Sequence, residues 1–209
     1  MGMQNFSLVF TAFFILLGPV KIIPAFAQLT QGADARYKRA LAGWGAAFAL
    51  GIAAFVALAG QTFVLKYHIS LSALRIAGGL VLLIAALHVM FAHPRPPEMP
   101  AVRPSALQLA VSPLAMPTIV PPAGIAAILI FIMLAGGYPG MWLAIVVSLA
   151  SILVLDYLVM LFNDAIVAIP GVLLIFRIVG GVLLFLQVAL AIQIMAIGIR
   201  GASSIEAVL

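Results

Sequence analysis

Four charged residues lie inside apolar stretches of this sequence, and their side chains are the ones that could do chemistry. Lys21, Arg75, Asp156 and Arg177 each interrupt such a stretch. A charge in apolar surroundings is costly unless it is paired or meets water, so residues of this kind usually belong to an ion pair, a substrate site or an ion path. We therefore treat these four as candidates for binding or coupling.

Three single residues each allow a functional and a structural interpretation. Lys21 is either an anchor for a substrate carboxylate or a lysine whose ammonium reaches the membrane surface. Asp156, the only acid inside an apolar stretch, is either a proton carrier or half of a structural ion pair. Histidine changes charge near physiological pH, so His88 is either a coupling residue or an ordinary histidine at the membrane interface.

No motif of a known enzyme class accompanies these residues. HExxH, P-loop and nucleophilic-serine patterns are absent, and no two carboxylates are paired. The chain has no cysteine, which excludes disulfides and thiolate metal sites. We therefore expect a protein that is not an enzyme, holds no metal or cofactor and does not use ATP itself; an intramembrane enzyme is the third alternative.

The composition places the chain in a lipid bilayer. Of its 209 residues, 66% are hydrophobic and 7% charged, with a mean hydropathy of +1.32, which is more apolar surface than a soluble fold of this size can bury. A spanning helix needs about 20 apolar residues. Six windows meet this length: residues 5–28, 41–64, 69–92, 107–135, 140–162 and 171–199. The sequence predicts an all-α membrane protein with six transmembrane helices.

Basic residues are unevenly divided between the two ends of these windows. The first, third and fifth links hold Arg36, Lys38, Arg39, Arg95 and Arg103. The opposite face holds Lys66 and Arg200. Basic residues favour the cytoplasmic side, so both termini are predicted to be extracytoplasmic. The net charge of +5 is spread over short links rather than gathered in a patch, so the bilayer, and not a nucleic acid, is the expected partner.

The phrase LRIAGGLVLL at residues 74–83 returns as FRIVGGVLLF at residues 176–185, a shift of 102 positions. The same shift places Pro19 on Pro121, so the two halves read as duplicates of three spans each. An odd number of spans turns the second copy upside down, which is typical of secondary transporters with substrate sites between their halves. The predicted units are repeat 1 (1–92), a Pro-rich cytoplasmic link (93–106) and repeat 2 (107–209).

Glycine and proline interrupt the first span and the fourth. Proline lacks a donor N–H and cannot continue a helix, but it fits the first turn of a new one. Each interrupted window is therefore predicted to be a helix, a short break and a second half-helix, whose free N–H groups would suit a carboxylate. Simple proline kinks are the alternative, but the matched positions in the two halves favour breaks. The predicted substrate-binding residues are Gly18, Pro19, Lys21, Pro121, Pro122 and Gly124.

Arg75 and Arg177 each lie about six residues, or roughly 9 Å by helical rise, inside their spans. Either they have a gating or structural role, or they contact the substrate directly. The glycine pair that follows each arginine would let a broken helix approach closely. Asp156 lies at the same depth as Arg177 on the neighbouring span, which predicts an ion pair between them, with Lys21 as the competing cation. The predicted gating or coupling residues are Arg75, His88, Asp156 and Arg177.

Four segments carry a resemblance to a known family: GPVKIIPAF (18–26), ISLSALRIAGGLVLLIAAL (69–87), PLAMPTIVPPAGI (113–125) and FRIVGGVLLFLQVALAIQIMAIGI (176–199). They resemble the MarC family of bacterial integral membrane proteins, which includes the neutral amino acid exporter SnatA and is grouped with LysE-type exporters. The resemblance implies export of small neutral amino acids or similar zwitterions across the bacterial inner membrane. Gly18 and Ile22 stand where the family motif has asparagines, so the resemblance carries the fold further than the substrate.

A non-transporting membrane subunit or scaffold is the alternative function. A transporter should have a water-accessible polar pocket near the midplane at the two breaks, whereas a scaffold should pack these breaks without one. The sequence leaves the substrate, the coupling ion, the transport direction and the oligomeric state open, a homo-oligomer included.

Overall fold

The computed structural model describes residues 2–91, 104–138 and 140–206. These residues form α1 (Gly2–Leu17), α2 (Ile22–Leu29), α3 (Ala35–Lys66), α4 (Leu71–Phe91), α5 (Ala106–Leu109), the distorted helix η1 (Ala110–Ile119), α6 (Pro122–Ala135), α7 (Met141–Leu161), α8 (Asn163–Val167) and α9 (Val172–Glu206). No strand occurs among them. Five helices are long and apolar enough to cross a membrane, or six if the bent pair of α5–η1 and α6 counts as one span. The predicted all-α membrane fold is confirmed.

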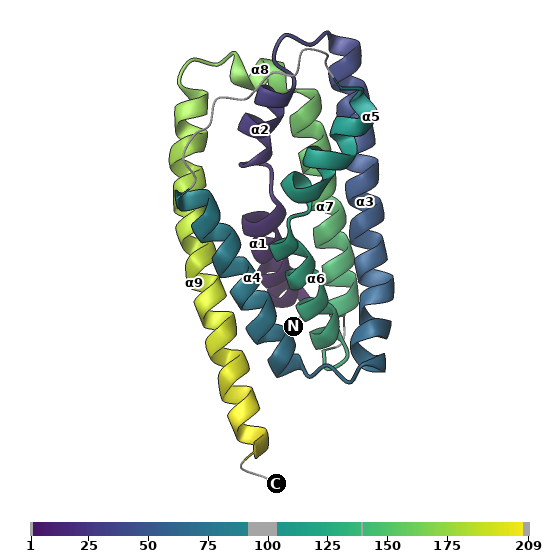
Figure 1. The fold of residues 1–209 in the computed structure, drawn as a ribbon, viewed down its shortest axis with the longest axis vertical. Helices are drawn as coiled ribbons and strands as arrows, with labels where there is room; N and C mark the ends of the chain where they lie inside the picture. The colour runs from purple at the N-terminus through teal and green to yellow at the C-terminus, as the bar shows by residue number, and fades with distance from the viewer. Residues whose placement is uncertain (1, 92–103, 139, 207–209) are drawn as a thin grey trace.

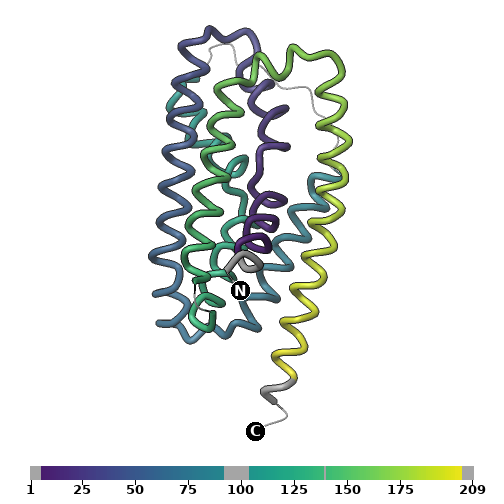
Figure 2. The backbone as a smooth tube through the Cα atoms, turned by 180° about the vertical axis from the view of Figure 1, so that it is seen from behind, coloured from purple at the N-terminus to yellow at the C-terminus, as the bar shows by residue number. Residues whose placement is uncertain are grey.

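The helices form one elongated bundle in which the two broken spans lie inside (Figure 1). α1 and α2 stack end to end, as do η1 and α6, and α3, α4, α7 and α9 surround them (Figures 1 and 2). Corresponding spans of the two halves run in opposite directions: α3 descends where α7 ascends, and α4 ascends where α9 descends (Figure 1). An inverted arrangement of two three-span halves requires this alternation.

Two helices extend beyond the predicted windows into residues expected in links. α3 begins at Ala35, so the three basic residues predicted in the first link lie on the helix. α9 runs to Glu206 and includes Arg200. A helix that leaves the membrane keeps its backbone hydrogen bonds in water, so polar residues alone do not end it. At the end of the bundle where α3 begins, Lys38 forms a salt bridge of 2.7 Å with Asp164 of α8.

The predicted Pro-rich link (93–106) falls almost wholly outside the described residues. Arg95 and Arg103 are in this part of the chain. Its last three residues are described, and there the hydroxyl of Tyr37 donates a hydrogen bond of 2.8 Å to the carbonyl oxygen of Pro104. This bond attaches the chain entering α5 to the start of α3.

The two glycine pairs differ in their packing. A Cβ atom on Gly79 of α4 would lie 2.8 Å from the carbonyl oxygen of Ala191 in α9, and one on Gly78 would lie 3.2 Å from Ala126 of α6. Cβ atoms on Gly180 and Gly181 of α9 would meet nothing within 4 Å. The prediction that each pair lets a broken helix approach closely is confirmed for α4, which meets α6, and is wrong for α9, where no atom lies within 4 Å of either added Cβ.

Substitution of these glycines should separate the packed pair from the open one. We expect Gly79→Ala to destabilise the protein by about 1–3 kcal/mol, the usual cost of overpacking a close contact. Gly181→Ala, at the equivalent repeat position, should leave stability unchanged or raise it by up to about 1 kcal/mol, because its Cβ enters open space and alanine favours a helix over glycine. Thermal unfolding of the purified protein in detergent measures both, and equal losses would contradict the α4–α9 contact.

Orientation in the membrane can be tested by single-cysteine labelling, because the chain has no cysteine of its own. Lys66 and Arg36 are both exposed and lie at opposite ends of α3. A membrane-impermeant maleimide should label Lys66→Cys only from the extracytoplasmic side and Arg36→Cys only from the cytoplasmic side. The opposite pattern would reverse the predicted topology.

Candidate functional site

The first break separates α1 from α2 at residues 18–21. A Cβ atom on Gly18 would lie 2.2 Å from the carbonyl oxygen of Phe14, so the chain can leave α1 in this way only at glycine. The carbonyl oxygen of Pro19 accepts hydrogen bonds from the amides of Ile22 and Ile23, at 3.0 and 3.1 Å. The carbonyl of Pro19 therefore satisfies the first two amides of α2, which begins at Ile22. The prediction that Pro19 is the first residue of this half-helix is wrong.

Lys21 joins the two half-helices of this break. It is the N-cap residue of α2, is half-buried, and its ammonium donates a hydrogen bond to the carbonyl oxygen of Leu16 in the last turn of α1. Carbonyls in the last turn of a helix have no partner within the helix, and a cation there also complements the helix dipole. Lys21 thus stays inside the bundle and does not extend to the membrane surface.

The second break bends its span by 59° between the helical segments 106–119 and 122–135. The backbone is extended at Ser112 and at Met116, each directly before a proline. Proline disfavours the helical conformation of the preceding residue, so unwinding begins at Ser112, well before the predicted site residues Pro121 and Pro122. Pro121 is the N-cap residue of α6 and Pro122 is its first residue, so Pro122 starts the half-helix.

The two breaks lie side by side. A Cβ atom on Gly124 would lie 2.8 Å from Cδ2 of Leu17, the last residue of α1. The amides of Gly124 and Ile125 donate to the carbonyl oxygen of Pro121, at 2.8 and 3.1 Å. Proline carbonyls thus occupy amides at the start of both half-helices that were predicted to be free for a carboxylate. A carboxylate must find most of its donors elsewhere.

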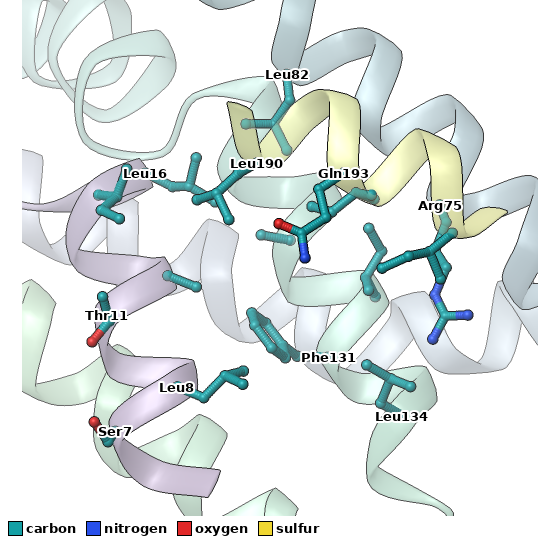
Figure 3. A pocket seen from close by; sticks show the side chains of 16 residues that line it. Ser7, Leu8, Thr11, Leu16, Arg75, Leu82, Phe131, Leu134, Leu190 and Gln193 are labelled. Atoms are coloured by element: carbon teal, nitrogen blue, oxygen red, sulfur yellow. The ribbon is translucent and has the colours of Figure 1, made fainter. Parts of the chain in front are cut away.

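A cavity of about 680 Å³ adjoins the first break, between α1, α4, α6 and α9 (Figure 3). Its wall is mostly apolar and includes Leu8, Leu16, Leu82, Phe131, Leu134 and Leu190. The polar lining residues are Ser7 and Thr11 of α1, Arg75 of α4 and Gln193 of α9. Gln193 points its amide into the cavity, and Arg75 lies at one end (Figure 3). An apolar space with few polar groups is the usual form of a small-molecule site.

A smaller cavity of about 50 Å³ lies at the break itself. Gly18 and Lys21 line it from the break, and Gly180 and Gln187 line it from α9. Ile15 lines both cavities. The larger space therefore leads toward Lys21, with this isoleucine between the two.

Asp156 faces the first break from α7. It is 1% exposed, neither carboxylate oxygen has a hydrogen-bond partner, and it interacts electrostatically with Lys21. Arg177 is exposed on the upper part of α9. The predicted pair of Asp156 with Arg177 is therefore not formed, because Asp156 is buried inside the bundle and Arg177 is exposed on its outer surface. The cation that faces Asp156 is Lys21, the predicted competitor.

The two remaining candidates, Arg75 and His88, differ in whether they line a cavity. Arg75 is half-buried at the larger cavity, whereas His88 is exposed near the end of α4 and lines neither cavity. The sequence analysis missed Gln187 and Gln193 of α9. The only signal for these two was that they are amides within the sixth apolar window.

Comparison with known proteins identifies relatives along the whole chain. The family described as "MarC family integral membrane protein" matches residues 3–203. A UPF0056 membrane protein of Methanocaldococcus jannaschii is 29% identical over 209 residues, which cover 97% of this chain and 99% of that protein. No solved structure matches the chain.

The interaction across the first break predicts a coupling in stability. Lys21→Met and Asp156→Asn should each destabilise the protein, by roughly 1–3 kcal/mol, because each leaves a charged group inside the bundle without the opposite charge that faces it. The double variant should lose less than the sum, whereas Asp156→Asn and Arg177→Gln should be additive. Thermal unfolding of the single and double variants measures both cycles. Additive losses for Lys21 and Asp156 would contradict their interaction.

Proposed function

Because the chain belongs to the MarC family of integral membrane proteins, we propose that it is a secondary transporter for a small neutral amino acid or a similar zwitterion. We place it in the bacterial inner membrane and assign it the export direction. Neither an ATP-binding motif nor a catalytic motif is present in the sequence, so an ion or substrate gradient would supply the energy.

The observation that carries this proposal is the meeting of two broken spans beside a cavity. Gly124 contacts Leu17, and the cavity of about 680 Å³ extends along α1 to the first break. Discontinuous helices at the interface between repeats are where secondary transporters bind their substrates. A transporter was expected to have a polar pocket at the breaks, whereas the large cavity is mostly apolar and the space at the first break is about 50 Å³. The support for transport over a scaffold is therefore the size of the larger cavity and the polar groups of Arg75 and Gln193 in its lining.

The lining of the cavity supports a zwitterion with an apolar side chain. The guanidinium of Arg75 and the amide of Gln193 supply donors for a carboxylate. The oxygen of the Gln193 amide supplies an acceptor for an ammonium group. Ser7 and Thr11 also line the cavity, but their hydroxyls point away from Gln193 and Arg75 (Figure 3). The remaining wall is apolar, which favours a neutral side chain over a charged one.

Exchange assays in reconstituted vesicles test this function. With labelled amino acids inside, addition of the same unlabelled amino acid outside should release the label for at least one neutral member of the panel. Arg75→Gln should raise the half-saturating concentration about tenfold or more, since a hydrogen bond to a charged group contributes roughly 1.5–3 kcal/mol. Lys66→Gln, which removes an exposed cation between α3 and α4, should leave it unchanged.

Two results of these assays would contradict the proposal. If folded protein exchanges no member of the panel in either direction, the transporter proposal fails and the scaffold becomes the better interpretation. If Arg75→Gln and Lys66→Gln weaken exchange equally, the cavity is not the substrate site.

A further inference from the structure

The cavity of about 680 Å³ has two unlike ends, and the closed end lies toward the two breaks. Leu16 lines this end from the last turn of α1, Ala127 from the α6 turn that follows the second break, and Leu82 from α4. These three side chains are 3%, 3% and 0% exposed. The closed end is therefore apolar and shut off from the surroundings of the bundle.

The opposite end is open and carries the polar groups. Leu8, Gln193 and Ile197 are exposed there, and Arg75 is half-buried. Gln193 points its amide into the cavity, and Arg75 lies at one end of it (Figure 3). Charged groups are costly in apolar surroundings unless they find partners. The charged part of a zwitterion therefore stays at this open end, and its side chain is directed to the closed one.

Helical rise gives the distance that a side chain must cover. Gln193 and Leu190 are three residues apart on α9, or roughly 4.5 Å along its axis, and Arg75 and Leu82 are seven residues apart on α4, or roughly 10 Å. The methyl group of alanine extends only about 1.5 Å from its α-carbon, whereas an unbranched chain of four carbons extends roughly 5 Å. The longer side chain reaches the closed end, and the methyl group does not.

The volume of the cavity favours a long side chain for a separate reason. One water molecule takes up about 30 Å³ of the liquid, so 680 Å³ equals the volume of roughly twenty waters. Glycine or alanine would leave the closed end empty or filled with water. An empty space loses van der Waals contacts, and water in an apolar space lacks hydrogen-bond partners. A side chain that fills this end avoids both costs and removes its own apolar surface from water.

We infer that the closed end, lined by Leu16, Leu82, Ala127 and Leu190, is a specificity pocket for the substrate side chain. The substrates that it selects are amino acids with long apolar side chains, such as leucine, methionine and norleucine, over glycine and alanine. The inference rests on the proposed function, because it specifies the side chain of the zwitterion proposed there. Binding involves no covalent step, so selectivity follows the apolar surface that the side chain buries.

A homologous series of amino acids measures the pocket. Glycine, alanine, 2-aminobutyrate, norvaline and norleucine are compared as unlabelled substrates in the vesicle exchange assay. The half-saturating concentration should fall about three- to fourfold for each added methylene beyond alanine, the effect of burying one CH₂ group. If exchange occurs but this concentration stays constant or rises along the series, the specificity pocket is overturned and the proposed function stands.

A variant that fills the closed end tests where the side chain binds. Ala127→Leu should raise the half-saturating concentration of norleucine about tenfold or more and leave that of alanine unchanged. Ala54→Leu is the matched control, because Ala54 is exposed on α3 and lines neither cavity. Equal effects of Ala127→Leu on both substrates would contradict the inference. Should this variant fail to fold, Leu190→Phe must give the same selective loss.

Thermal stabilisation separates binding from transport. A ligand that binds the folded protein raises the unfolding midpoint according to its affinity. Norleucine should therefore stabilise the purified protein in detergent more than alanine does at equal concentration, and Ala127→Leu should remove the difference. If this pattern is found but no amino acid is exchanged, the pocket stands and the proposed function fails. Equal stabilisation by the two amino acids, or none, in a protein without exchange overturns both.

Discussion

Hydrogen bonding of the backbone inside the bilayer is the constraint on which this structure depends. An unpaired amide or carbonyl in hydrocarbon is so costly that a span can unwind only where other groups supply partners. At the first break Pro19 accepts from two amides and Lys21 donates to one carbonyl. At the second, Pro121 accepts from Gly124 and Ile125. Each break is stable because it contains its own caps.

The charged side chains inside the bundle lie around Lys21, which caps the first break. The hydrogen bond from Lys21 to the carbonyl oxygen of Leu16 holds the ammonium inside the membrane. A cation is tolerated there because an anion faces it. Asp156 of α7 is that anion, and it is buried with no hydrogen-bond partner for either carboxylate oxygen. The part of α1 that precedes the break borders the cavity of about 680 Å³, which α4, α6 and α9 also line. One interrupted helix therefore separates this cavity from the buried carboxylate of Asp156.

The spans and the two breaks could be predicted from the sequence, whereas the direction of a side chain around its helix could not. Apolar windows and matched prolines predicted the spans and both breaks, because length and proline chemistry are local properties. The predicted pair of Asp156 with Arg177 used equal depth alone, and it is wrong because one side chain faces the bundle interior and the other faces outward. Thr11 and Gln193 become cavity residues only when four helices assemble, which no single segment reveals.

The two copies of the glycine phrase have nearly the same sequence and unlike surroundings. Gly78 and Gly79 fit against α6 and α9, while Gly180 and Gly181 have open space where the same contacts would form. Duplication of a phrase therefore does not duplicate its packing, because a glycine pair makes a close contact only where a neighbouring helix lies within reach.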